Sequence, residues 1–334
     1  MLKLPRAVTT ITPQRLSFAG GGTDLPGFFE RFGGAVVSSA IDKYIYVTVK
    51  RHSPLFEEAY RLSYSKTEHV DNLDEVENDV ARECLRLVKV DPPLFIATAS
   101  DLPVSTGLGS SSSFAVGLLY ALHVMRGEDV SAGQLAEEAC HVEINVLGHP
   151  IGKQDQYAAA FGGLNYIGFQ PDGRVHLDSV WVPGDGATAM FGHFMLFWTG
   201  VQRDARKVLR EQRDNIPRTS ETLVQMRDMA ARCRDVLLGD GDVPARLGSL
   251  LNEGWRAKRS LASTISTSDI DAMYDRAIAA GAIGGKIAGA GGGGFLFLVV
   301  APDRQAEVRT ALGVLDVRVG YEPRGARLLS VVPG

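Results

Sequence analysis

The sequence predicts an α+β protein of two domains that meet at a cleft. The length of 334 residues suits about two domains of ordinary size. Mixed strands and helices come first along the chain, and a second set of helices and strands follows, which is the pattern of two layered units. The run Pro183-Gly184-Asp185-Gly186 separates the two sets and is typical of a boundary. We therefore expect one domain over residues 1–184 and another over residues 185–334.

In the first part, β-branched and aromatic runs predict the strands, and the helical spacing of apolar residues predicts the helices. Pro13 is expected to interrupt the first extended segment. Strands are expected at residues 8–11, 15–19, 35–39, 44–50, 61–65 and 94–99, and a hairpin at 164–169 and 175–177. Helices are expected at residues 25–33, 76–88, 114–125 and 131–147, with a turn and then a short helix over 152–163.

The second part has fewer strands and longer helical segments. Strands are expected at residues 193–198 and 294–300, and the chain is expected to end in a hairpin over 315–331. Helices are expected at residues 205–238, 244–280 and 304–312.

Composition excludes several classes of protein. Hydrophobic residues make up 45% and charged residues 22% of the chain, which are globular values. The net charge of −4 argues against a nucleic-acid surface, and the N-terminus lacks the apolar segment of a signal peptide. No run of 18 apolar residues predicts a membrane span. The cysteines Cys84, Cys140 and Cys233 form no CxxC pair, which favours a reducing compartment. We expect a cytoplasmic protein with no nucleic-acid or membrane partner.

A glycine–serine loop is the most informative local feature. Residues 103–113 read PVSTGLGSSSS and lead directly into the apolar helical run FAVGLLYALHVM. Successive serines suit the first turn of a helix, where backbone N–H groups lack intrahelical partners. Those N–H groups and the positive end of the helix dipole favour an anion, most often phosphate. Gly107 and Gly109 let the backbone approach a ligand closely. A serine-capped buried helix is the alternative, but capping needs one serine rather than four.

This loop is neither of the two best-known phosphate loops. No lysine follows its glycines, as a Walker loop requires, and Ser112 stands where a dinucleotide fingerprint has its third glycine. A formal GxGxxG at residues 289–294 precedes a predicted strand instead of lying between a strand and a helix. The sequence therefore predicts a phosphate site of another kind.

Three acids are candidates for chemistry beside that phosphate. Glu143 lies on a predicted helix and Asp155, 12 residues later, in the turn that follows, so both can face one cavity. Asp155 has glycine, glutamine and small apolar neighbours, which is unusual for a solvated acid. Asp24 in GGGTD is ambiguous in the same way: it is either a functional acid or, as is commoner for an aspartate after three glycines, a turn residue or helix cap. Lys153 is either a phosphate contact or, as we favour, a surface lysine.

Four segments together resemble the motifs of the GHMP kinase superfamily. They appear in that family's order and span nearly the whole chain: RLSFAGGGTDLP at 15–26, PVSTGLGSSSS at 103–113, GHPIGKQDQ at 148–156 and KIAGAGGGGF at 286–295. The strings FAGGGTDLPGFFERFGGAVVSSAIDKYIYV and FWTGVQRDA further resemble the D-glycero-D-manno-heptose 7-phosphate kinases. The first motif reads AGGGTDLP where galactokinases carry a GEHTDY-like string, which argues against galactose as the substrate. The fucokinase-like branch shares the GGGTD string, so the family is better defined by these motifs than the exact sugar.

The resemblance implies a fold and a set of roles. It implies a first domain like domain 2 of ribosomal protein S5 and a ferredoxin-like second domain. ATP would bind the loop at Pro103, Gly107, Leu108, Gly109, Ser110, Ser111 and Ser112. Ser111 (with Ser110 next) and Glu143 would hold Mg2+, and Asp155 would accept or orient the hydroxyl proton beside Arg15. Sugar contacts are expected from Gly22, Thr23, Asp24, Gly291 and Gly292.

The implied reaction is phosphorylation of the anomeric hydroxyl of a heptose 7-phosphate by ATP, for nucleotide-activated heptose synthesis. The acceptor's own phosphate then needs a second cation, for which Arg203 in TGVQRD is the candidate, although a surface arginine is an equal reading. The alternatives are another sugar kinase of this fold, acting on an L-fucose-like substrate, and a non-catalytic sugar-binding regulator. A homodimer is left open.

Overall fold

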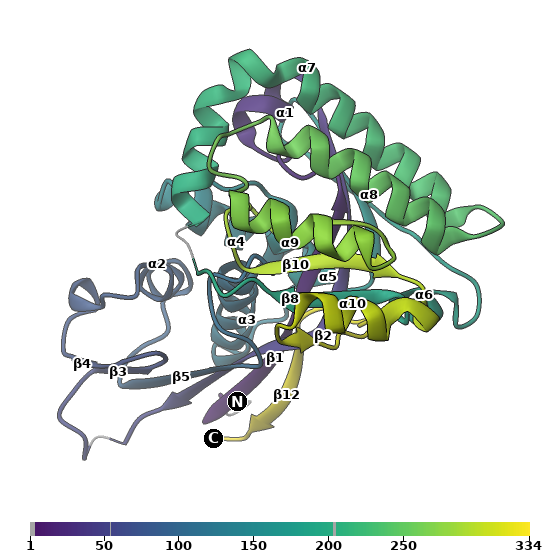
Figure 1. The fold of residues 1–334 in the computed structure, drawn as a ribbon. Coiled ribbons are helices and arrows are strands. Elements are labelled where there is room, and N and C mark those ends of the chain that lie inside the picture. The colour runs from purple at the N-terminus through teal and green to yellow at the C-terminus, as the bar shows by residue number, and fades with distance from the viewer. Residues whose placement is uncertain (1–3, 54, 203–204) are drawn as a thin grey trace.

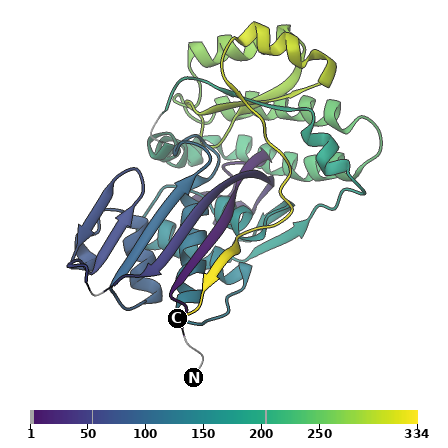
Figure 2. The ribbon, with the colours of Figure 1, turned by 90° about the horizontal axis from the view of Figure 1, so that it is seen from below.

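The computed structural model of the protein describes residues 4–53, 55–202 and 205–334. Two β-sheets lie in different parts of the molecule, and helices cover them (Figure 1). The larger sheet belongs mainly to the first part of the chain and the smaller sheet to the second. The final strand returns to the larger sheet, where it lies beside the first strand (Figure 2).

The larger sheet has eight strands within the described residues, in the order β12-β1-β2-β5-β3-β4; in addition, β6 pairs with β2, and β7 pairs with β6. Its longest strand, β2, is shared between two partners: its first half pairs with β6 and its second half with β5. The strands are β1 (Ala7–Ala19), β2 (Gly34–Arg51), β3 (Tyr60–Ser63), β4 (Thr67–Val70), β5 (Leu94–Ser100), β6 (Leu164–Phe169), β7 (Val175–Ser179) and β12 (Arg327–Val332).

Helices of the first part cover one face of this sheet and bury a common core with it. The central helix, α3, lies so close to β1 that a Cβ atom on Gly117 would stand 2.7 Å from Thr12 Oγ1. Thr10 Oγ1 donates a hydrogen bond of 2.9 Å to the Gly117 carbonyl, which fixes α3 on the sheet. The helices of this face are α2 (Asp79–Val88), α3 (Ser110–Met125), α4 (Ala132–Cys140) and α5 (Gln154–Phe161), with a 3-10 turn η1 (Leu73–Glu75) and a π-helical turn η2 (His141–Val146). The short helix α1 (Pro26–Phe32) instead packs against α7 (Ala205–Leu238) of the second part (Figure 1).

The smaller sheet has the order β11-β8-β10-β9 and is buried on both faces. Leu196 and Phe297 pack toward α7 and α8, whereas Met195 and Leu298 share a cluster with residues of α9 and α10. Burial on both faces explains the uninterrupted apolar run of β10. The elements are α6 (Gly186–Phe191), β8 (Phe194–Trp198), α7 (Ala205–Leu238), α8 (Val243–Arg259), α9 (Ser268–Ala279), β9 (Ala282–Ile287), β10 (Phe295–Val300), η3 (Pro302–Arg304), α10 (Gln305–Leu312) and β11 (Asp316–Val317).

Several predicted boundaries are wrong for identifiable reasons. The segments around Pro13 form one strand, because a shift of register after Pro13 accommodates a residue without an N–H group. The helix predicted over 244–280 is two helices, since Thr267 caps a new one by accepting a hydrogen bond from the Ile270 N–H. The predicted terminal hairpin does not form: β11 pairs with β8, and β12 crosses to β1.

Two further expectations concern cysteines and membranes. All three cysteines are free and buried. No helix among the described residues is long and apolar enough to cross a membrane.

Candidate functional site

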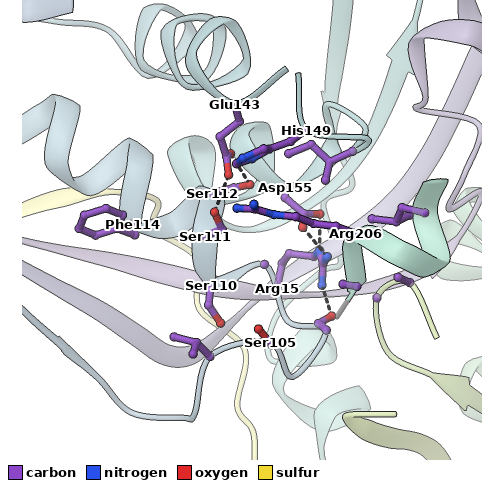
Figure 3. Close-up of a pocket in the computed structure, with 18 of the residues that line it drawn as sticks. Arg15, Ser105, Ser110, Ser111, Ser112, Phe114, Glu143, His149, Asp155 and Arg206 are labelled. Carbon is purple, nitrogen blue, oxygen red and sulfur yellow. Dashed lines mark hydrogen bonds and ion pairs between the residues drawn. The ribbon is translucent and has the colours of Figure 1, made fainter. Parts of the chain in front are cut away.

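A cavity of about 750 Å³ lies where the two parts of the chain meet. The first part contributes the GGGTD turn, the glycine–serine loop, η2 and α5, and the second part contributes the start of α7, α8 and the glycine-rich loop after β9. Figure 3 shows the side chains of Arg15, Glu143 and Asp155 gathered around the three serines at the start of α3. The cavity therefore brings together residues that are distant in the sequence.

The glycine–serine loop forms the helix terminus that its sequence predicts. Gly107 and Gly109 both have φ of 84°, in the left-handed region, and α3 begins at Ser110 directly after Gly109. Helix geometry leaves the N–H groups of the first turn without intrahelical acceptors, and this turn faces the cavity. Pro103, Gly107, Gly109, Ser110, Ser111 and Ser112 line the cavity, whereas the Leu108 side chain is buried outside it.

The second glycine loop packs directly on the first. A Cβ atom on Gly289 would lie 2.5 Å from the Gly107 Cα atom, and one on Gly107 would lie 2.4 Å from the Ala288 carbonyl oxygen. Neither position has room for a side chain. The glycine-rich string is therefore required by its close packing against the glycine–serine loop.

Glu143 is the central acid of the serine cluster. Its Oε1 accepts a hydrogen bond of 2.6 Å from Ser111, and its Oε2 accepts bonds of 2.7 Å from Ser112 and from Gln156 Nε2. The carboxyl group is fully buried, and burial raises its pKa while these hydrogen bonds oppose the rise. The helix predicted over 131–147 is α-helical only as far as Cys140 and continues as the π-helical turn η2. A π-helix has wider turns than an α-helix, so the side chain of Glu143 lies on a different face than α-helical spacing would give it.

Arg15 and Asp155 form a bidentate ion pair beside Gly109, where a Cβ atom would lie 3.3 Å from Asp155 Oδ2. Arg15 Nε and Nη2 donate to the two Asp155 oxygens at 2.7 and 2.6 Å, and Nη1 donates to the Gly107 carbonyl at 2.7 Å. Arg15 is only 4% exposed. Asp155 lies in the first turn of α5, not in the turn before it, which corrects the sequence prediction. The pair thus ties β1, α5 and the phosphate loop together.

Asp24 lies at the same wall and is buried. It accepts hydrogen bonds from the Gly22 N–H at 2.9 Å and from Gln154 Nε2 at 3.1 Å. Burial, and to a lesser extent the charge of Asp155, raise the pKa of Asp24. Gly22 also lines the cavity, but the Thr23 hydroxyl is bonded to the Gly20 and Ala35 carbonyls and lies outside it. Asp24 is therefore both a residue of the GGGTD turn and an acid at the wall of the cavity.

Two buried lysines were not predicted. Lys258 on α8 lines the cavity and donates to the Gly289 carbonyl, and burial followed by the charge of Arg15 lowers its pKa to about 8. Lys286 at the end of β9 also lines it and donates to the Phe18 carbonyl at 3.3 Å. Lys286 is the first residue of the motif KIAGAGGGGF, so the motif could have identified it as a residue of the site. Nothing in the sequence distinguishes Lys258 from a surface lysine.

Some predicted contacts lie elsewhere. Gly291 and Gly292 are not among the residues that line the cavity within the described chain; the Gly292 N–H instead donates to the Ile265 carbonyl. Gly289 and Ala290 take their place at the wall. Arg203, the candidate for the acceptor phosphate, lies outside the residues that the structure describes.

Two family models and a relative of similar length match this chain. The sequence model of the GHMP kinases N terminal domain matches residues 75–163, and that of the GHMP kinases C terminal domain matches residues 242–313. A D-glycero-alpha-D-manno-heptose 7-phosphate kinase of Campylobacter jejuni is 30% identical over 318 residues, which are 92% of this chain and 93% of that protein. The chain belongs to the GHMP kinases. It is an ATP-dependent kinase of that family, as the ordered motifs imply.

Other members of the family are similar over much of the chain. A mevalonate kinase of Thermococcus onnurineus is 29% identical over 248 residues, which are 71% of this chain and 70% of that protein. The solved structure of a D-glycero-D-manno-heptose 1-phosphate kinase from Bacteroides thetaiotaomicron has a TM-score of 0.79 at 24% identity, covering 97% of this chain and 99% of that one. A Lactococcus lactis galactokinase complexed with galactose has a TM-score of 0.74 at 16% identity, covering 96% and 95%. These structures show that this GHMP kinase has the predicted two-domain fold.

The close packing of the two glycine loops can be tested with a matched pair of substitutions. Gly289→Ala and Gly313→Ala place a side chain at similar left-handed angles, φ 66° and 61°, but only Gly289 faces another chain segment. We expect Gly289→Ala to lower the free energy of unfolding by about 1–3 kcal/mol more than Gly313→Ala, the usual cost of overpacking, and to raise the KM for ATP. Equal losses in denaturant titrations of the two variants would contradict the packing.

Proposed function

We propose that this GHMP kinase transfers the γ-phosphoryl group of ATP to the anomeric hydroxyl of D-glycero-D-manno-heptose 7-phosphate, giving the 1,7-bisphosphate for nucleotide-activated heptose synthesis. The similarity to the Campylobacter jejuni protein over almost its full length supports this acceptor. The observation that carries the chemistry is the convergence of a phosphate-binding helix terminus, a serine–glutamate pair and an arginine–aspartate pair on one cavity.

The loop from Gly107 to Ser112 would bind the phosphates of ATP. Its helix terminus offers N–H donors and a partial positive charge, and its two left-handed glycines keep the backbone open to the ligand. Phosphoryl transfer needs alignment and charge stabilisation more than covalent help, so a fixed array of donors suits the reaction.

Ser111 and Glu143 fit the magnesium ion that the family resemblance implies. The serine hydroxyl and the carboxylate oxygen lie 2.6 Å apart, so two hard oxygen ligands are already side by side. The described residues hold no group of three or more metal-binding side chains, which suits an ion that takes most of its ligands from phosphate and water. When bound, the ion would neutralise charge on the transferring phosphoryl group.

Asp155 would orient the acceptor hydroxyl and accept its proton at a carboxylate oxygen. Arg15 holds both of those oxygens and is itself bonded to the phosphate loop at Gly107, so the carboxylate has a fixed direction relative to the phosphates. Asp24, held by Gly22 and Gln154 at the same wall, would bind hydroxyl groups of the sugar. The role of Arg203 in holding the acceptor's own phosphate stays a prediction from sequence, to be tested as a rise in the KM for the sugar phosphate in Arg203→Ala.

Asp155→Asn tests the proposed proton acceptor. Asparagine keeps the shape of the side chain but cannot take a proton, so turnover should fall on the order of a hundredfold or more while ATP still binds. Steady-state ADP release and ATP titration measure the two effects, and Asp275→Asn on the exposed side of α9 is the matched control. Turnover near that of the control would remove Asp155 from the mechanism.

Glu143→Gln tests the proposed magnesium ligand. A neutral amide is a poorer ligand for a hard cation, so the magnesium concentration for half-maximal activity should rise at least about tenfold. The exposed Glu253→Gln serves as the control. If the two variants give the same magnesium titration, Glu143 is a structural acid only.

A panel of acceptors tests the substrate. We expect ADP release to be fastest with D-glycero-D-manno-heptose 7-phosphate and slower with L-fucose, galactose, mevalonate and homoserine. A better rate with an unphosphorylated sugar would reject the heptose 7-phosphate assignment and favour the L-fucose-like alternative. Absence of turnover with every member of the panel would show that the acceptor lies outside these classes and would reject the proposed substrate.

A further inference from the structure

Three buried polar atoms around the GGGTD turn have no hydrogen-bond partner in the described structure. They are Ser17 Oγ, Gln154 Oε1 and Gln212 Nε2, and the three side chains line the cavity. Ser17 is 7% exposed and Gln212 only 1%. Because an unpaired buried donor or acceptor is unfavourable, such atoms are expected to find partners in a ligand.

The three side chains come from different elements but meet at the same turn. A Cβ atom on Gly21 would lie 3.6 Å from Ser17 Oγ and 3.9 Å from Gln154 Nε2. A Cβ atom on the next residue, Gly22, would lie 2.2 Å from Gln212 Nε2. Ser17 belongs to β1, Gln154 to α5 and Gln212 to α7, so the two glycines make the space in which the three meet.

Asp24 adds a charged acceptor to this group. Its Oδ2 accepts a bond of 3.1 Å from Gln154 Nε2, which fixes the orientation of the amide. Gln154 Oε1 is then a buried acceptor without a partner among the described residues. The set then contains one amide donor, one amide acceptor and one hydroxyl that can do both. A carboxylate or a phosphate oxygen cannot donate to Gln154 Oε1, whereas neighbouring hydroxyl groups of a sugar can donate and accept together.

We propose that Ser17, Gln154 and Gln212 form the subsite that recognises adjacent hydroxyl groups of the acceptor, and that Gln212 is a specificity-determining residue for it. This inference rests on the proposed function in taking the acceptor to be a sugar. Because α7 belongs to the second part of the chain and the GGGTD turn to the first, a sugar bound here contacts both. An acceptor with adjacent hydroxyl groups is thereby favoured over one that brings only carboxylate or phosphate oxygens to this subsite.

The test uses Gln212→Met, which keeps the length of the side chain and removes the amide, with Gln225→Leu on the exposed side of α7 as the control. The sugar of the panel that wild-type protein phosphorylates fastest is the acceptor. We expect Gln212→Met to raise the KM for that sugar about 10- to 100-fold, as loss of hydrogen bonds to a ligand does, and to leave the KM for ATP unchanged. In the absence of ligand its melting temperature should equal or exceed that of wild type, since an unpaired buried amide is lost.

Monodeoxy analogues of the sugar provide the second measurement. In wild-type protein, removing the hydroxyl that binds Gln212 raises the KM, and in Gln212→Met the same removal should cost nothing further. An unchanged sugar KM, or a lower melting temperature with both KM values raised together, would overturn the subsite. Failure of heptose 7-phosphate as an acceptor would reject only the proposed function, because the comparison can be made with any sugar that is turned over.

Discussion

The ion pair between Arg15 and Asp155 is the contact on which the rest of the site depends. The Arg15 guanidinium lies between a carboxylate on α5 and the Gly107 carbonyl of the phosphate loop, and it is almost completely buried. Removing one partner of such a pair leaves a buried charge uncompensated, which typically costs about 3–5 kcal/mol. The planar fork of arginine also fixes direction, which a lysine would not do. A single side chain thus sets the acid, the loop and the first strand relative to one another.

The charges of the cavity are arranged for ligands that bring charge of their own. Asp24, Glu143, Lys258 and Lys286 are all buried, and burial is the largest cause of the shift in each of their pKa values. The acids are shifted upward and the lysines downward, as expected for groups removed from water without full compensation. Bound nucleotide, metal ion and acceptor would supply the missing partners, so the protein carries an electrostatic cost that binding relieves.

Sequence reasoning reached most of this arrangement because the local signals were strong. The serine-rich first turn of α3, the stop of α1 at Gly33 and the hairpin of β6 and β7 follow from local rules and were predicted. The strand β9 was missed, since AIGGKI has two glycines where a strand normally has packed side chains. Gly284 is needed because α8 crosses closely: a Cβ atom there would lie 2.0 Å from the Gly248 carbonyl oxygen. Gly285 is needed because a Cβ atom there would lie 2.1 Å from the Phe297 carbonyl oxygen of β10.

The remaining errors are errors of tertiary context. The pairing of β12 with β1, distant ends of the chain, has no local signal. The π-helical turn that positions Glu143 and the burial of Lys258 beside Gly289 likewise depend on neighbours that only the folded chain supplies. Motif order predicted the acids that line the cavity, but it could not show that Gln212 of α7 stands against Gly22.

A double-mutant cycle tests most directly the central claim that Arg15 and Asp155 act as one unit. Turnover at saturating ATP and acceptor would be measured for wild type, Arg15→Lys, Asp155→Asn and the double variant. If the role of Arg15 is to fix the Asp155 carboxylate, the double variant should be no slower than Asp155→Asn alone, because residues that act together are strongly non-additive. Losses that multiply in the double variant would show that the two side chains act independently and would contradict the account.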